Sequence, residues 1–474
     1  MKKEKGSITL FSLLSLLLVT AFLFGLLEGT RLQEMRRFAM LQTETAIEST
    51  FANYNTCLWK SYRLLGTNRN RMDETLEKVA KGRMGKGTNF LQLEPTKICI
   101  TGDIRITDGE GLMFIASVTD YMKENLIFET AKEVYNQYEA IKQILEQNKM
   151  DLSHIKEALE IPMNEKKERT RNRDVSALLE SAEKWMKMGI LQLVIEDTGK
   201  ISEGKQDFTK GLLQRNLEKG SVPVEYCINW MDRVLLQQYL LTYLSSYTKE
   251  QDNRALSYEL EYLLGKNSSD IENLKETANR LLGVREAVNF LYLLSDATSV
   301  AQAEAMAILL AGATASPALI QVVKMGLLTA WALAESILDV RALLVGKRIP
   351  LLKSQESWTV DLENLSTIAD GFPMAKESKW GLTYKDYLGI LLLLEDEASL
   401  AMHSMNLQEA TIRKNDMDPN FCMDRLLIEA CVAITYTYEP VFPFLRKIDA
   451  EERWERRIST TAAYGYYGEA GIKG

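Results

Sequence analysis

A glycine- and lysine-rich stretch, GRMGKGT at residues 82–88, is the first place where the sequence could support chemistry. In a phosphate-binding loop, backbone amides surround the phosphates and a lysine reaches the terminal ones. Here only two residues separate Gly82 from Gly85, and Lys86 is followed by Gly87 instead of Ser or Thr. The spacing therefore favours a flexible linker over a nucleotide site.

Two further groups have residue types that enzymes use. Ser181 and Lys184 form an SxxK pair, the spacing that places both side chains on one helix face in serine acyl enzymes, but the sequence has no KTG partner. Glu395, Asp396 and Glu397 follow an apolar run, and neighbouring helical residues point about 100° apart. We interpret the first group as a coincidence and the second as a solvated helix face. No catalytic residue is assigned, and we expect a protein that is not an enzyme.

Metal and cofactor sites find little support. His154 and His403 are the only histidines, so a multi-histidine metal site within one chain is excluded. The cysteines are scattered without a CxxC motif, which favours buried free thiols over a zinc site or a disulfide framework. If the body lies outside the membrane, Cys422 and Cys431 are the pair that could bridge. The full set is Cys57, Cys99, Cys227, Cys422 and Cys431. We expect no cofactor.

Chain length and net charge limit the number of structural units and the kinds of partner to expect. A chain of 474 residues exceeds what one hydrophobic core usually serves, so two or three structural units are expected. The net charge of −8 gives no reason to expect nucleic acid as a partner. A basic run at residues 165–174 is read as a solvated linker, with an anionic surface or polymer as the alternative.

The elements begin with a long apolar segment. Residues Ile8 to Leu27 carry no charge, and a helix over them spans about 30 Å, the thickness of a bilayer's hydrocarbon core. A secretory signal would have a shorter apolar region and a small-x-small cleavage site, but Gly25, Leu26, Leu27 and Glu28 follow Phe24. The segment therefore predicts a permanent membrane anchor, with the lipid bilayer as a partner.

Charges flanking the anchor do not fix its orientation by count. Three cations on each side balance: Lys2, Lys3 and Lys5 before it, and Arg31, Arg36 and Arg37 after it. A short basic stub is hard to translocate, whereas a long folded domain crosses largely regardless of its charge. We expect a single-pass protein of the cell membrane, with a cytoplasmic amino terminus and an extracytoplasmic body.

Periodicity predicts an α+β fold that is predominantly helical. The transmembrane helix continues into a long amphipathic helix whose apolar stripe runs from Leu32 to Leu65. Two strands are expected around a Gly102-Asp103 turn, and a strand at 255–265. Helices are expected at 111–149, 174–195, 234–247 and 270–294, an exposed loop at 196–211, and strands in CVAITYTYEPVF (431–442) and RRISTTAAYGYY (456–467).

Four regions follow from these elements. They are the membrane anchor at 1–28, a helical stalk and linker at 29–90, an α+β region with exposed loops at 91–228, and a helix-rich α+β region with carboxyl-terminal strands at 229–474. Within the last region, residues 305–323 again carry no charge. We read them as a buried helix pair turning near Ser316 and Pro317, with a second crossing or a membrane-lying hairpin as the alternative.

The residues around the start of the anchor resemble a known class. A basic stub, Gly6, Ser7 and an unbroken apolar helix are the layout of a pilin-like amino terminus, and KGSITLF resembles the start of minor pseudopilins of the Tad type (TadE/TadG-like). The sequence departs from the prepilin pattern at Phe11, where prepilins carry a glutamate. That difference puts cleavage after Gly6 in doubt.

Later segments resemble a family of uncharacterised bacterial envelope proteins known only as a domain of unknown function. The resemblance lies in patches at 27–39 (LEGTRLQEMRRFA), 49–66, 243–296, 332–358 and 384–394 (YKDYLGILLLL). It implies an amino-terminal anchor, an extracytoplasmic body and an association with Tad-like pilus or secretion machinery.

The sequence thus predicts a membrane-anchored structural protein, a minor pseudopilin-like component of a Tad-type pilus or related envelope assembly. Its partners would be other pilin-like or secretion-system membrane proteins that pack on the amino-terminal helix. The alternative is a membrane-anchored enzyme or ligand-binding sensor. Gly6 and Ser7 form the candidate processing junction, and the candidate packing positions are Phe11, Ser12, Ser15, Thr20 and Gly25.

Overall fold

A computed structural model describes residues 4–82, 93–124, 189–311, 316–363, 372–415, 419–439 and 457–467, together with the single residues 139, 143 and 365. The chain divides into two compact units, each made of segments that are distant in sequence. Unit 1 comprises residues 1–120, 216–226 and 422–474, and unit 2 comprises residues 121–215 and 227–421.

Unit 1 combines helices with the sheet. Its elements are α1 (Glu4–Phe51), α2 (Thr56–Tyr62), β1 (Thr67–Asn68), α3 (Arg69–Gly82), β2 (Leu93–Arg105), α4 (Leu112–Lys123, continuing past the boundary with unit 2), the 3-10 turn η4 (Met423–Arg425), β3 (Leu426–Tyr438) and β4 (Arg457–Gly465). All strand pairs are antiparallel, and β3 is central. It pairs with β2 along one edge and with β4 and the short β1 along the other.

The described part of unit 2 contains helices and 3-10 turns. They are α7 (Ile190–Val194), η1 (Thr198–Lys200), η2 (Leu212–Gln214), α8 (Trp230–Tyr243), α9 (Glu259–Gly265), α10 (Asp270–Ser295), α11 (Ala297–Ala311), α12 (Pro317–Leu344), α13 (Tyr384–Leu393) and α14 (Glu397–Asn415). Helices α10 and α12 pack together, as do α11 and α12. This predominantly helical chain with one small antiparallel sheet confirms the predicted fold class.

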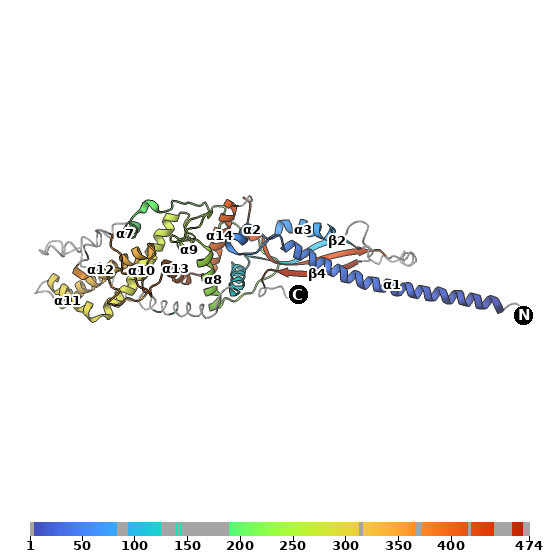
Figure 1. Cartoon of the computed structure of the whole chain (residues 1–474), viewed down its shortest axis with the longest axis horizontal. Coiled ribbons are helices and arrows are strands. Elements are labelled where there is room, and N and C mark those ends of the chain that lie inside the picture. The colour runs from blue at the N-terminus through green and yellow to red at the C-terminus, as the bar shows by residue number, and fades with distance from the viewer. Residues whose placement is uncertain are drawn as a thin grey trace. The chain divides into compact units, whose positions relative to one another are not determined.

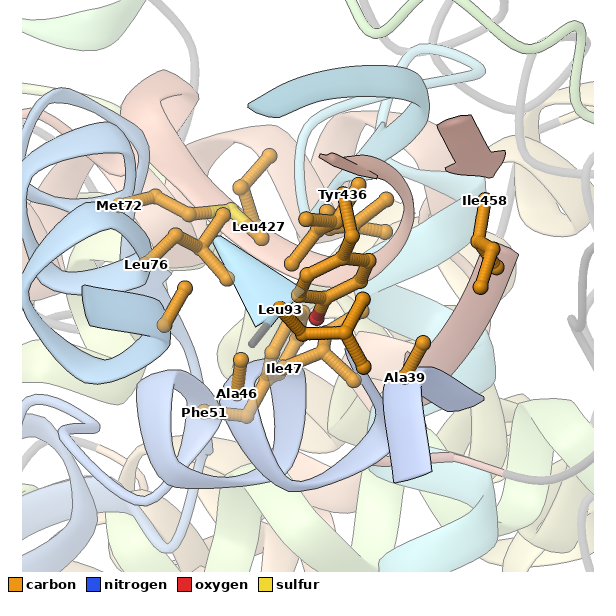
Figure 2. Close-up of a cluster of buried hydrophobic side chains, with 14 of the residues drawn as sticks. Ala39, Ala46, Ile47, Phe51, Met72, Leu76, Leu93, Leu427, Tyr436 and Ile458 are labelled. Carbon is orange, nitrogen blue, oxygen red and sulfur yellow. The ribbon is translucent and has the colours of Figure 1, made fainter. Parts of the chain in front are cut away.

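The core of unit 1 lies between α1 and the sheet. In Figure 1, α1 runs alongside β4 and continues well beyond the strands. Figure 2 shows side chains converging from α1, α3 and the strands, among them Ile47, Leu76, Leu93 and Tyr436. On β3 the buried side chains alternate through Val432, Ile434 and Tyr436, because successive residues of a strand face opposite sides of the sheet.

The predicted hairpin around Gly102 and Asp103 is wrong. Residues 93–105 form the single strand β2, which pairs with β3 along its length through register shifts, one of them between Ile100 and Gly102. Glycine in a strand also marks bulges, where one residue is left unpaired. Asp103 does not form a turn. Its carboxylate accepts hydrogen bonds from the backbone N–H (3.1 Å) and the hydroxyl (2.6 Å) of Ser221.

The amphipathic stalk is shorter than its sequence pattern indicated. Helix α1 ends at Phe51, and the apolar residues from Leu58 to Tyr62 belong to the separate helix α2. The new helix begins after Asn55, whose side chain accepts the Leu58 backbone N–H at 2.8 Å and so caps α2. The apolar pattern therefore runs on through the sequence from α1 into α2, although the two helices are separate.

The strand predicted at 255–265 is also wrong, because Glu259–Gly265 forms α9. Its alternation came from two glutamates that are buried instead of facing water. Glu259 accepts the Ser245 backbone N–H and Glu261 accepts that of Tyr247, both at 2.9 Å. The sequence pattern treated Glu259 and Glu261 as the water-facing side of a strand, whereas both are buried carboxylates that accept backbone hydrogen bonds.

Several other predictions are confirmed. Helices α8 and α10 and strands β3 and β4 overlap the predicted segments, although α8 and β3 begin and end four to five residues earlier than predicted. Residues 196–211 form an irregular segment that contains η1. Helix α4 covers the beginning of the helix predicted at 111–149, and α7 the end of that at 174–195. Most of the remainder of both, and the basic run at 165–174, fall outside the described residues.

Candidate membrane anchor and assembly surface

The first half of α1 is exposed in the described chain. Its most apolar window has a mean hydropathy of 2.5 and is 0% buried. Phe11 is 75% exposed and Leu18 is 70% exposed. A helix whose whole circumference is apolar and unburied is stable only in an apolar surrounding. The structure therefore supports the membrane anchor.

The second half of α1 is fixed to the sheet of unit 1. The contact begins at Arg31, which forms an ion pair with Glu28 at 2.8 Å and donates to the Glu439 carbonyl oxygen at 3.1 Å. Further along, the Thr43 hydroxyl lies 3.1 Å from the Tyr436 hydroxyl and 2.6 Å from that of Thr460. One continuous helix thus joins the membrane segment to the folded unit without a hinge.

The predicted packing positions do not share one face of α1. An α-helix has about 3.6 residues per turn, so Phe11, Ser15 and Gly25 lie on roughly the same side. Thr20 follows Phe11 by about two and a half turns and lies opposite, where its hydroxyl donates to the Leu16 carbonyl oxygen at 2.9 Å. Ser12 lies about a quarter turn from Phe11.

Gly29 is a further candidate packing position, which sequence reasoning missed. It follows Gly25 by four residues, which places both glycines on one face in the GxxxG spacing of associating membrane helices. A Cβ built on either glycine meets nothing within 4 Å. The backbone at both positions is therefore open to close approach by another helix.

The candidate processing junction lies within the regular part of the chain. The backbone of Gly6 and Ser7 belongs to α1, which begins at Glu4. Cleavage after Gly6 would remove the first helical residues and leave the apolar segment from Ile8 intact.

The other residues whose side chains could do chemistry have structural partners or fall outside the described chain. Glu395 pairs with Lys266 at 3.0 Å, Asp396 accepts the Ser399 backbone N–H at 2.8 Å, and Glu397 pairs with Arg233 at 2.6 Å. The three carboxylates thus stabilise separate contacts. The predicted helix face is wrong, because Glu395 and Asp396 lie in the turn between α13 and α14 and only Glu397 is helical. Residues 83–92, 150–188 and 416–418, which include Ser181, Lys184 and His154, are not described.

His403 is a half-buried residue of α14. Its Nδ1 lies 2.8 Å from the Ser399 carbonyl oxygen, and burial lowers the pKa of its imidazole. Its contact with its own helix indicates a packing role.

The cysteines form no disulfide, and all five lie among the described residues. Cys431 lies inside β3, five residues after the strand begins at Leu426, and Cys422 lies before the strand, on the other side of the 3-10 turn η4. An extended strand separates its residues by about 3.3 Å each, so these two thiols are too far apart to bridge. The prediction that the cysteines form no disulfide framework is confirmed, but their predicted burial is wrong, because Cys227 is exposed and the other four are only partly buried.

Unit 2 contains a small cavity of about 190 Å³ between residues 206–211 and α14. Glu409 in its wall is held by Arg215 and by Arg413, at 2.6 and 2.7 Å. Asn406 in its floor donates to the Tyr262 hydroxyl at 2.9 Å, and its Oδ1 has no hydrogen-bond partner among the described residues. This cavity is the feature that fits a ligand-binding alternative.

The helix pair predicted around Ser316 and Pro317 is present as α11 and α12, and the Ser316 side chain accepts the Leu319 backbone N–H at 3.3 Å. Its expected burial is wrong. Among the described residues of 305–323, only Ala307 is buried. Helix α12 is also long and apolar enough to cross a membrane, with a mean hydropathy of 1.5 and 28% of its most apolar window buried.

Comparison with known proteins gives one match, to a family of unknown function (DUF5702) over residues 166–438. The match covers α7 to α14 and ends with β3, so it excludes the membrane anchor. No curated protein matches the chain, and no solved structure matches it. Because the match covers more than half of the sequence, the chain belongs to the DUF5702 family of unknown function.

Proposed function

We propose that this protein is a membrane-anchored, extracytoplasmic structural subunit, a minor pseudopilin-like component of a Tad-type pilus or a related envelope assembly. One observation carries the proposal. A single helix, α1, is bare and apolar in its first half and packs on an antiparallel sheet in its second half. In this proposal the body is extracytoplasmic, the amino terminus is cytoplasmic, and the protein has no catalytic role.

The physical argument is that both lipid and neighbouring helices can cover the exposed apolar surface of the first half of α1. Association of helices in a membrane relies on close packing at small residues, because lipid tails are as apolar as leucine. Gly25 and Gly29 provide such a site, and Phe11 and Ser15 lie on the same side of α1. The rigid connection through Arg31 and Thr43 would transmit the position of a packed anchor to unit 1.

A substitution pair tests the packing surface in the cells that produce the protein. Gly25→Leu should reduce co-purification of other membrane subunits severalfold, because a side chain would hold the partner helix away. Thr20→Leu, on the opposite side, should leave co-purification unchanged. Unit 1 should fold normally in both variants, since no atom lies within 4 Å of a Cβ at Gly25.

Unchanged co-purification from Gly25→Leu would contradict the proposed packing face. The intact mass of the mature protein would report separately whether the chain is cleaved after Gly6. A gene neighbourhood that holds a secretion ATPase and a prepilin peptidase would favour the pilus assignment over a passive anchor.

The alternative function is a membrane-anchored ligand sensor that uses the cavity beside Asn406. Asn406 Oδ1 has no hydrogen-bond partner among the described residues, so a small molecule with a donor group would fit its chemistry. Thermal unfolding of the full chain in detergent with a panel of amino acids and sugars tests this. A shift that disappears in Asn406→Leu would favour the sensor, and no shift would favour the structural role.

A further inference from the structure

The α11–α12 hairpin ends in an apolar tip, which we define as the described residues 305–311 and 316–323. No Asp, Glu, Lys or Arg occurs between Glu304 and Lys324. These two charged residues form an ion pair with each other at 3.0 Å, from Lys324 Nζ to Glu304 Oε2. The pair therefore marks a boundary across both helices, beyond which the hairpin tip carries no formal charge.

The surface of the hairpin tip is exposed in the described chain. Leu309 is 70% exposed and Ile308 is 45% exposed. Other helices of unit 2 that face water carry charges outward, as α10 does with Glu272 and Lys275. The hairpin tip has only uncharged side chains in the corresponding positions, so it lacks the usual surface of a water-facing helix pair.

The length of the hairpin tip excludes a full crossing. From Pro317 to Lys324 the helix rises about 10 Å, whereas the hydrocarbon core is about 30 Å thick. A longer span along α12 would have to include Trp331 and Glu335. The Trp331 indole N–H donates to the Val360 carbonyl oxygen at 2.7 Å, and Glu335 pairs with Lys353 at 2.6 Å with both side chains fully buried. That half of α12 belongs to the core of unit 2.

We propose that the hairpin tip inserts into one leaflet of a lipid bilayer, as a second membrane contact that does not cross it. About 10 Å of helix fits within a single leaflet, whose hydrocarbon is about 15 Å deep. Glu304 and Lys324 would then lie at the level of the headgroups. Lipid is the chosen occupant because the tip is free of charge and the same chain already carries a membrane anchor in α1. This inference goes beyond the proposed function; it shares the membrane anchor in α1 with that proposal and does not depend on the pilus role.

Spin-label accessibility tests the insertion in the full chain reconstituted into phosphatidylcholine–phosphatidylglycerol vesicles. A spin-labelled unnatural amino acid replaces Leu309, so that the native cysteines remain. Collision with oxygen, which concentrates in lipid, is compared with collision with a water-soluble nickel chelate. We expect the oxygen-to-nickel ratio at 309 to be severalfold higher than at Ala301, which is an exposed residue of α11 on the other side of Glu304.

Two further positions calibrate the result. A label at Leu18 in the membrane anchor gives the ratio for lipid, and a label at Ala305, also exposed, repeats the measurement about one turn from 309. High nickel accessibility at both 305 and 309 would overturn the proposal in favour of a water-facing tip. Low accessibility to both reagents would overturn it in favour of a protein partner or a second copy.

Discussion

At the residue scale, unit 2 contains a network of charged side chains that are fully removed from water. Arg285 and Asp339 pair at 2.8 Å, and Lys353 bridges Asp339 and Glu335 at 2.7 and 2.6 Å, with all four side chains 0% exposed. Glu335 also accepts the Val360 backbone N–H at 2.9 Å. The network ties α10 and α12 to the segment around residues 350–360.

Breaking this network should destabilise unit 2 strongly. Asp339→Leu leaves Arg285 and Lys353 with an uncompensated charge, and removing one partner of a buried pair costs about 3–5 kcal/mol. Urea unfolding of the full chain in detergent, followed with a spectroscopic probe in unit 2, measures the change in the free energy of unfolding. The exposed pair of Lys275 and Glu272 is the matched control, and Glu272→Leu should change stability by less than about 1 kcal/mol. Equal effects would contradict a structural role for the network.

A second residue-scale prediction concerns Glu261. Burial raises the pKa of its carboxyl to about 7, although the Tyr247 backbone N–H and the Tyr384 hydroxyl both donate to it. The folded state therefore binds a proton more tightly than the unfolded state. Stability from this group is greatest below the ordinary pKa of about 4.5 and falls as the pH rises through 7.

Glu261→Gln removes this titration and keeps an acceptor for both donors. We expect the variant to gain stability relative to the natural chain between pH 5 and pH 8, by up to about 3 kcal/mol. Paired denaturation curves at these pH values measure the difference. A difference that stays constant with pH would show that Glu261 is ionised throughout.

At the scale of elements, α1 has a bare half and a packed half, and the packed half should determine the stability of unit 1. Phe51 at its end packs on the rings of Tyr464 and Tyr466, with centroids 5.1 Å away in each case. Phe51→Ala should cost about 3–5 kcal/mol through lost packing and a cavity.

Met40 provides the control for this helix, because it is 53% exposed on the same packed half. Met40→Ala should change the stability of unit 1 by no more than about 0.5 kcal/mol. Thermal unfolding followed by circular dichroism separates the two variants. Similar losses from both would mean that α1 is not fixed to the sheet through Phe51.

At the scale of the whole molecule, attachment to the membrane depends on α1. A chain that lacks residues 1–27 should be released by alkaline carbonate, whereas the full chain should stay in the membrane pellet, because a span of about 20 apolar residues inserts stably. The hairpin tip alone would give only a peripheral contact that carbonate removes. Retention of the shortened chain in the pellet would point to a second crossing.

The sequence determined the membrane anchor by itself, because the charge-free run from Ile8 to Leu27 is a local property that needs no partner. It also predicted strands β3 and β4 and helices α8 and α10. On β3 and α10 the buried positions follow the period of a strand and of a helix, respectively. The sequence prediction treated Phe11, Ser12, Ser15, Thr20 and Gly25 as one set of packing positions. The continuous helix α1 and its angular spacing place only Phe11, Ser15 and Gly25 on the same side.

Only the tertiary structure decided the features that depend on distant segments. Residues 93–105 form one strand because β3 pairs with them along their full length, so the local Gly102 signal for a turn lost to cross-strand hydrogen bonds. Glu259 and Glu261 imitated a polar strand face because their backbone partners, Ser245 and Tyr247, lie elsewhere in the chain. Polar residues that are buried against remote donors carry no local signal of their burial, and the fold alone assigns them.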